Sequence, residues 1–342
     1  MSTSDSCKDG ASKSNCVEDI EGRLQNMSMT DEDNSVSICA NCGKEGANNV
    51  CNKCKMVKYC NAVCKKVHKK KHKKDCEEYQ KLAAEKHNEQ LRIAADLHDI
   101  ELFKQPPPEE DCPICFLLLP SMESGWRYYA CCGKVICGGC AYAPVYDNKG
   151  NEVLEKKCSF CRTLLPTTDK EMIKRYKKRM NAGDPIAVYN LGNYYRDGEY
   201  GLPQDSKKAL ECWHRAGELG NAEAYCCVGF AYYSGKGVEI DKKKARHYFE
   251  LAAMKGGTSA RYNLGIFEEN QSNWTRSLKH HMIAVRSGHA KSLQVVKGLY
   301  SKGHATKEDY TKALQAYQEY LGEIKSIQRD KAAAAKDEYR YY

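Results

Sequence analysis

Apolar side chains are scarce at the start of the chain and become periodic only farther along it. Residues 1–38 are rich in Ser, Asp, Asn and Glu and contain no aromatic residue, so they can bury too little apolar surface to offset the entropy lost on ordering. We therefore predict a disordered acidic tail over 1–38. Over 77–104, apolar residues recur near helical spacing and then meet the prolines at 106–108, which predicts a helix and a proline-rich linker over 77–111.

A second helix is predicted over 167–183. Thr168 and Glu171 have the spacing of a capping box, in which each side chain bonds the other residue's backbone N–H. Gly183 is placed to end this helix, because glycine adopts the left-handed conformation that often follows a last helical turn. The helix would link the preceding part of the chain to a periodic region that begins at residue 184.

From residue 184 a pattern of two helices repeats. A short segment of small and apolar residues around a glycine recurs at intervals of 37, 36 and 33 residues. The four glycines are Gly192, Gly229, Gly265 and Gly298. A period near 36 residues built from helix pairs is typical of a solenoid, and glycine at these positions would let the two helices of a pair approach closely.

The glycine-rich connectors at 198–205 and 235–241 make this region resemble Sel-one-like repeats, which are relatives of the tetratricopeptide type. The resemblance implies an all-α helical-repeat solenoid over 184–320 that contacts other proteins. We expect two regular repeats, a third that lacks the glycine-rich connector, and a divergent fourth that acts as a cap. A C-terminal helix and tail are expected over 321–342, with the helix extending over 323–338.

Several side chains of the repeats invite a functional interpretation. Many tyrosines fall on the first helix of each pair, where they could line a concave peptide-binding face, but packing between repeats is the favoured interpretation. Cys212, Cys226 and Cys227 lack the spacing of metal ligands and are predicted to be buried small hydrophobic residues. His280 and His281 have no metal-binding partners nearby in the sequence and are predicted to lie at the surface.

Cysteine is the residue type that changes this picture most. The 342-residue chain contains 20 cysteines, and 15 of them lie between residues 39 and 161. The first ten residues are polar and charged, which argues against a secretory signal and a disulfide-stapled secreted protein. No apolar run is long enough to span a membrane. In a reducing intracellular compartment, cytoplasm or nucleus, clustered cysteines are usually metal ligands, so Zn²⁺ is the expected cofactor.

Over 39–76 the candidate ligands come in four pairs. They are, in order, Cys39 and Cys42, Cys51 and Cys54, Cys60 and Cys64, and His72 and Cys76. Thiolate and imidazole groups suit zinc, and eight ligands in four pairs predict two tetrahedral ions. A CxxC pair fits a tight turn on which the two sulfurs converge, whereas ligands four residues apart share one face of a helix.

This order of pairs, with Tyr59 directly before the third pair, closely resembles the MYND zinc finger. The resemblance implies interleaved sites: Cys39, Cys42, Cys60 and Cys64 hold one ion, and Cys51, Cys54, His72 and Cys76 hold the other. It also implies docking of proline-rich peptides. A module of this size should fold only with metal. His68 could compete with His72 as a ligand, but only His72 lies one turn from Cys76, so His68 is predicted to be a solvated neighbour.

A second cysteine-rich segment spans 112–162. Its cysteines are Cys112, Cys115, Cys131, Cys132, Cys137, Cys140, Cys158 and Cys161. Three CxxC pairs, with further cysteines before the middle pair, resemble a RING zinc finger, which implies one ion at Cys112, Cys115, Cys137 and Cys140. The family usually carries a histidine where this chain has Lys134, and a protonated lysine cannot donate a lone pair. We assign Cys131, Cys132, Cys158 and Cys161 to the second ion, with a three-ligand or empty site as the alternative.

The RING resemblance implies a ubiquitin ligase, which holds a loaded ubiquitin-conjugating enzyme and supplies no nucleophile of its own. Ile114 matches the family position that contacts this enzyme, and Arg162 matches an arginine that bridges ubiquitin and enzyme. Ser159, where proline is common, and Lys134 argue against activity. No catalytic triad, phosphate loop or acid–base pair is visible.

Two functions therefore remain open for a multidomain protein with two small zinc-stabilised modules and a solenoid. One is an adaptor with ubiquitin ligase activity, and the other is a scaffold or transcription-related regulator without it.

A net charge of +9 suggests a nucleic-acid partner, but the positive charge is concentrated in one segment of the chain. Residues 1–38 sum to −5 and residues 39–76 to +9, so the chain outside 39–76 sums to zero. Seven lysines lie within 65–74, and a solvated helix face is the favoured interpretation of this run. The expected partners are proteins, including proline-rich peptides and a ubiquitin-conjugating enzyme, rather than nucleic acid or membranes.

Overall fold

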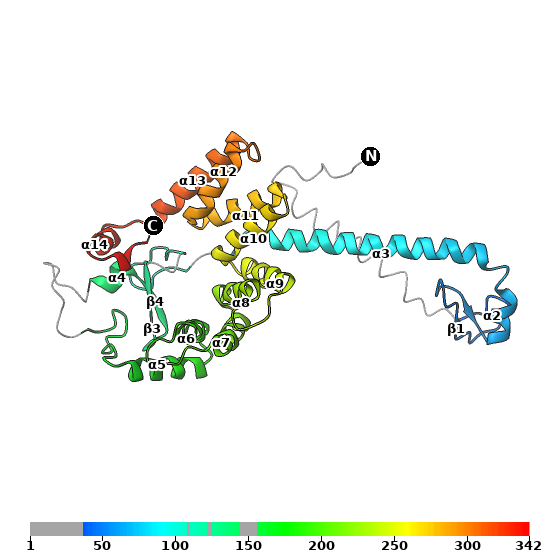
Figure 1. Ribbon diagram of the computed structural model, residues 1–342, viewed down its shortest axis with the longest axis horizontal. Coiled ribbons are helices and arrows are strands. Elements are labelled where there is room, and N and C mark those ends of the chain that lie inside the picture. Colours follow the sequence, from blue (N-terminus) through cyan, green and yellow to red (C-terminus); the bar gives the residue numbers. More distant parts are fainter. Residues whose placement is uncertain (1–36, 108–109, 122–124, 144–155, 342) are drawn as a thin grey trace. The chain divides into compact units, whose positions relative to one another are not determined.

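The chain divides into two compact units, Met1–Glu101 and Leu102–Tyr342. The computed structural model describes residues 37–107, 110–121, 125–143 and 156–341. It has the expected fold class, a cysteine-rich zinc-binding region followed by a mostly helical solenoid (Figure 1). The predicted acidic tail lies almost entirely outside the described residues. Among the helices described, none combines the length and the apolarity needed to cross a lipid bilayer.

The first unit contains the first cysteine-rich segment and most of a long helix. A short hairpin pairs β1 (Asn49–Val50) with β2 (Lys58–Tyr59), and α2 (Ala62–His68) follows. The side chain of Asn61 caps α2 by accepting a hydrogen bond from the backbone N–H of Cys64 at 2.9 Å. The long helix α3 (Lys73–Leu102) confirms the helix predicted over 77–104 but begins four residues earlier, so that it carries a predicted zinc ligand.

The second unit begins with the second cysteine-rich segment. An antiparallel hairpin pairs β3 (Trp126–Tyr129) with β4 (Lys134–Cys137), and the short helix α4 (Gly138–Tyr142) follows directly. The helix α5 (Asp169–Asn181) confirms the second predicted helix.

Only half of the predicted capping box at the start of α5 is formed. The side chain of Thr168 accepts from the backbone N–H of Glu171 at 3.3 Å, whereas the Glu171 carboxylate pairs with Arg175 instead. Gly183 follows the helix with φ +78°, as expected for a glycine that ends a helix.

Four helix pairs stack in series after α5. They are α6 (Pro185–Asp197) with α7 (Ser206–Glu218), α8 (Ala222–Ser234) with α9 (Lys242–Met254), α10 (Thr258–Asn270) with α11 (Trp274–Arg286), and α12 (Ala290–Ser301) with α13 (Lys307–Ile324). In Figure 1 the pairs follow one another from green to orange. The predicted period is therefore confirmed, and the divergent fourth segment is a complete helix pair.

The glycines of the first three pairs lie where two helices touch. A Cβ atom placed on Gly192, Gly229 or Gly265 would come within 2.6, 2.7 or 2.3 Å of Trp213, Phe249 or His281, respectively. Real Cβ atoms do not approach other atoms so closely, so the predicted role of these glycines is confirmed. In the fourth pair, a Cβ atom on Gly298 would meet nothing within 4 Å.

The prediction that His280 and His281 lie at the surface is wrong. Both side chains are fully buried, on helix α11. His281 occupies the place against Gly265 that an aromatic ring fills in the first two repeats. The His280 ring packs on Phe103, with 4.6 Å between the ring centroids. A spacing rule for metal ligands could not detect this, because the position in the repeat, rather than the residue type, determines the burial.

The tyrosines and cysteines of the repeats test two further predictions. Tyrosines pack on one another within and between helix pairs, as Tyr232 and Tyr248 do with stacked rings 5.6 Å apart. Cys226 is buried as expected, but Cys212 and Cys227 are only half-buried. The favoured interpretation of the tyrosines as packing residues is thus supported by their contacts.

The C-terminal helix expected over 323–338 is interrupted. Helix α13 ends at Ile324, and the separate helix α14 (Ile327–Ala335) begins after Ser326, whose side chain accepts from the backbone N–H of Arg329 at 3.2 Å. A short 3-10 helix, η1 (Asp337–Tyr339), follows. Helix α14 packs on α4, so the end of the chain returns to the second cysteine-rich segment.

Candidate metal centres

The cysteines and His72 gather in four clusters within the described part of the chain. The clusters are Cys39, Cys42, Cys60 and Cys64; Cys51, Cys54, His72 and Cys76; Cys112, Cys115, Cys137 and Cys140; and Cys131, Cys132, Cys158 and Cys161. Within each cluster the ligand atoms lie within 4.8 Å of one another. The structure thus brings together the four sets of side chains that the sequence analysis proposed, and the sets interleave along the chain in both segments.

In the first segment, different elements deliver the members of each cluster. His72 is buried, and its Nε2 lies 3.3 Å from the Sγ of Cys54. The Sγ atoms of Cys51 and Cys76 are 3.8 Å apart, although one follows β1 and the other lies on α3. Short contacts of this kind between a turn and a helix are what a tetrahedral ion requires of four ligands.

The prediction that His68 is a solvated neighbour is only half right. His68 stays outside the ligand cluster, but its side chain is partly buried, and its Nδ1 lies 3.2 Å from the hydroxyl of Tyr59. Its ring stacks on His72 with 5.8 Å between centroids. His68 therefore supports a ligand rather than facing only water.

In the second segment, adjacent cysteines reach a common cluster. The Sγ atoms of Cys131 and Cys161 are 3.4 Å apart, and those of Cys132 and Cys158 are 3.8 Å apart. The turn between β3 and β4 is held from outside by Arg179, whose guanidinium donates to the carbonyl of Cys131 at 3.0 Å. Lys134 is exposed and lies outside the cluster, as its chemistry predicts.

Four CxxC turns share one backbone geometry that the sequence analysis missed. The residue after the second cysteine has positive φ in each: Gly43 at 73°, Lys55 at 56°, Phe116 at 55° and Arg162 at 62°. Its backbone N–H donates to the carbonyl of the first cysteine at 2.9 to 3.0 Å. Only one of these residues is glycine, so the signal that could have revealed the turn was the CxxC spacing itself.

The thiols of each cluster are too close to ionise independently. Burial opposes the ionisation of Cys39 and Cys51, but hydrogen bonds from neighbouring backbone groups lower the pKa of each to about 6. Hydrogen bonding with Cys64 and Cys42 raises the pKa of Cys60 to about 12. A bound cation would allow several thiols of one cluster to be ionised at once, because its positive charge stabilises neighbouring thiolates together. Three four-cysteine sets and one set with a histidine match the ligands that zinc prefers.

The two residues proposed to contact a conjugating enzyme are accessible. Ile114 is 36% exposed inside the first CxxC turn of the second segment, and Arg162 is exposed directly after its last cysteine. The same turns expose two apolar rings that the sequence analysis did not single out, Phe116 at 77% and Phe160 at 44%. Their only sequence signal was an aromatic residue within or just after a CxxC pair.

Comparison with known families identifies two of the modules. The family model of the MYND finger matches residues 39–76, and the model of the Sel1 repeat matches 185–221 and 222–257. The chain therefore contains a MYND finger and two Sel1 repeats. Together they support a zinc-binding adaptor that contacts other proteins.

Curated relatives resemble only part of the chain. It is 24% identical over 131 residues to chitin synthase regulatory factor 4 of Schizosaccharomyces pombe, covering 38% of this chain and 21% of that protein. It is 34% identical over 101 residues to the ERAD-associated E3 ubiquitin-protein ligase component HRD3B of Arabidopsis thaliana, covering 29% and 15%. The chain thus spans about a fifth or less of the length of these relatives.

A solved structure resembles about half of the chain. A Sel1 repeat protein from Oxalobacter formigenes is 26% identical, with a TM-score of 0.38, and the match covers 48% of this chain and 64% of that one.

Proposed function

We propose that this chain is a zinc-dependent adaptor in which the MYND finger (39–76) and the repeats (184–320) hold protein partners, while the segment 112–162 recruits a ubiquitin-conjugating enzyme. The MYND finger and the Sel1 repeats support the adaptor. The relative from Arabidopsis thaliana is itself described as a component of an E3 ubiquitin-protein ligase. The recruiting role of 112–162 is supported by its interleaved cysteine clusters and by the exposed side chains on its CxxC turns.

Each of the four clusters would hold one zinc ion. Four protein ligands fill a tetrahedral site and leave no position for a substrate or a water molecule, so the ions would have a structural rather than a catalytic role. The metal would supply cross-links between turns and helices that share little apolar core. In the MYND finger that core consists of three buried residues, Cys39, Ala47 and Tyr59.

The observation that carries the ligase proposal is the exposure of apolar side chains on turns that zinc would hold rigid. Ile114, Phe116 and Phe160 lie on such turns, and large apolar side chains on a fixed surface are the usual anchors of a protein partner. Arg162 offers a guanidinium at the end of the same module. A ligase of this kind accelerates transfer by orienting the thioester of its partner enzyme, so no nucleophile is needed from this chain.

An in vitro ubiquitylation assay with the full chain and a panel of conjugating enzymes tests this function. We expect chain formation that falls at least about tenfold in Ile114→Ala and Arg162→Ala, the loss that removing about 1.4 kcal/mol of binding or orientation would cause. Ile240→Ala is the matched control, because Ile240 is 64% exposed but lies in a connector of the repeats. Absence of activity with every enzyme, or equal activity in all variants, would contradict the ligase proposal.

The second candidate is a scaffold without enzymatic output. It is favoured by Lys134, which replaces the usual ligand of the RING family, and by Ser159, which stands where proline is common. The scaffold predicts that the full chain captures protein partners through the repeats while the same assay shows no ubiquitin transfer. Transfer that depends on Ile114 would exclude it.

A further inference from the structure

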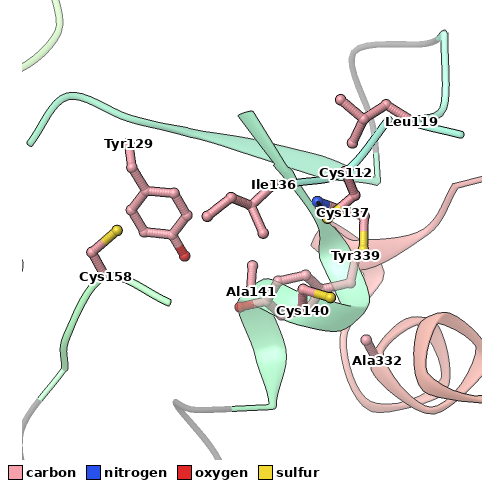
Figure 2. Packing of buried hydrophobic residues seen from close by; sticks show 10 residues of the cluster. All are labelled: Cys112, Leu119, Tyr129, Ile136, Cys137, Cys140, Ala141, Cys158, Ala332 and Tyr339. Atoms are coloured by element: carbon pink, nitrogen blue, oxygen red, sulfur yellow. Dashed lines mark hydrogen bonds between the residues drawn. The ribbon is translucent and has the colours of Figure 1, made fainter. Parts of the chain in front are cut away.

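The end of the chain is built into the second cysteine-rich segment. We call residues 326–341 the C-terminal segment. Ala332 and Tyr339 of this segment belong to the same buried cluster as Cys137, Cys140 and Ala141. Figure 2 shows Ala332 and Tyr339 beside the turn of α4 that carries Cys140 and Ala141. The core of the module proposed to bind zinc is therefore completed by residues about 190 positions away.

Three glycines of the second cysteine-rich segment make room for the C-terminal segment. A Cβ atom on Gly139 would lie 2.9 Å from the backbone nitrogen of Arg329, and one on Gly125 would lie 2.3 Å from the Cβ of Tyr341. A Cβ atom on Gly138 would come within 3.3 Å of Tyr339. Because backbone atoms cannot easily move aside, a side chain at these positions would collide with the C-terminal segment in its present place.

Arg329 is the buried centre of this contact. Its side chain is 1% exposed. Nη1 donates to the carbonyl oxygens of Leu118 and Ile324, both at 2.7 Å, and Nη2 donates to the carbonyl oxygen of Leu117 at 3.2 Å. Nη2 also lies 3.9 Å from the Sγ of Cys115. The guanidinium thus holds both the end of α13 and the turn that follows Cys115.

The charge of Arg329 has no carboxylate partner among the described residues. A buried guanidinium without a negative neighbour is costly. The nearest group that can carry negative charge is the four-cysteine cluster of Cys112, Cys115, Cys137 and Cys140. A zinc ion held by four thiolates has a net charge of about −2, so the arginine would offset about half of the negative charge of the metal cluster.

We infer that Arg329 is a positioning residue of the metal centre formed by Cys112, Cys115, Cys137 and Cys140, and that the C-terminal segment is an integral part of this zinc module. The inference rests on the proposed zinc site. Arg329 holds the turn after Cys115 in place through its hydrogen bonds to the carbonyl oxygens of that turn. Its positive charge also lies beside the thiolates of the cluster. Because α14 packs on α4, this face of the module is closed to a protein partner.

Arg329→Met tests the inference in the full chain, because methionine keeps much of the buried volume and removes the charge and the donors. We expect zinc to leave this variant for a chromogenic chelator at least about tenfold faster than from the wild type, the lower range for loss of an outer-shell partner. In NMR of the cadmium-substituted protein, one four-sulfur signal should shift. Arg340→Met is the matched control, because the Arg340 side chain is 68% exposed on the same segment.

Arg329→Lys separates charge from geometry. A lysine keeps the charge but loses the planar fork that reaches several carbonyls, so its zinc release should be slower than that of Arg329→Met and faster than that of the wild type. If the lysine and methionine variants release zinc at the same rate, the charge has no role. Wild-type release and unchanged cadmium signals in Arg329→Met would overturn the inference as a whole.

Gly139→Ala provides a test that leaves Arg329 chemically intact. The added methyl group would displace the backbone of α14, so this variant should also release one zinc ion faster than the wild type. Gly322→Ala is the control, because a Cβ atom there would meet nothing within 4 Å. Equal release from both variants would contradict the coupling of α14 to the metal centre.

Failure of the underlying zinc site has a separate signature. If Cys112→Ser does not lower the number of zinc ions per chain, the proposed site itself is wrong. If Cys112→Ser lowers it and Arg329→Met behaves as the wild type, only the role of Arg329 is wrong.

Discussion

At the scale of single residues, buried polar side chains distinguish this chain from a simple assembly of repeats. The zinc ligands could be predicted from the sequence, because a tetrahedral ion requires ligands at set spacings such as CxxC. The burial of His280 was not readable, because a histidine in a helix gives no local sign of the tertiary position that it fills. The positive φ of Phe116 and Arg162 was also hidden, since it follows from the turn and not from the residue type.

His280 makes the stability of the repeats depend on pH. Burial, together with the positive charges of Arg261 and Arg276, lowers the pKa of His280 to about 2. In the unfolded chain this histidine takes up a proton below about pH 6.5, whereas in the folded chain it stays neutral. The stability that it supports is therefore complete above about pH 6.5 and declines as the pH falls below that value.

The measurement is the free energy of unfolding in urea at pH 7.5 and pH 5.5. His280→Leu should lose less stability between these two pH values than the wild type does, by about 1 kcal/mol. The exposed His87 provides the control, and His87→Leu should follow the wild type. The same pH dependence in His280→Leu and in the wild type would show that His280 is not a source of the acid sensitivity.

At the scale of elements, the repeat period predicted the helix pairs but not the end of the chain. Residues 332–335 are alanines with high helix propensity, which favoured one continuous helix over 323–338. The structure breaks that helix because Ser326 caps a new one and Arg329 bonds the carbonyl of Ile324. Tertiary contacts with the second cysteine-rich segment override the local preference here, and no local pattern reports them.

The helix-pair contacts predict opposite effects for one substitution at two equivalent glycines. Gly229→Ala would place a methyl group 2.7 Å from Phe249, so it should destabilise the chain by about 1–3 kcal/mol through overpacking. Gly298→Ala meets no atom within 4 Å and should stabilise the chain by about 0.5–1 kcal/mol, because alanine is the better helix former. Urea unfolding of both variants measures the difference. Effects of the same sign would contradict the close approach of α8 and α9.

At the scale of the whole molecule, zinc would stabilise the cysteine-rich segments, whereas packing between helices stabilises the repeats. The MYND finger has too small a core to fold without metal, whereas the repeats bury apolar clusters of their own, such as those around Trp213 and Phe249. Removal of zinc should therefore unfold the cysteine-rich segments and leave much of the helical signal of the repeats. The roles in partner binding that we propose require both parts.

The number of zinc ions per chain tests the central claim most directly, and native mass spectrometry of the full chain measures it. The account predicts four ions per chain, two in the MYND finger and two in the segment 112–162. It also predicts that replacing the paired ligands Cys131 and Cys132 with serine lowers the number to three. A wild-type count of three or fewer would contradict the account.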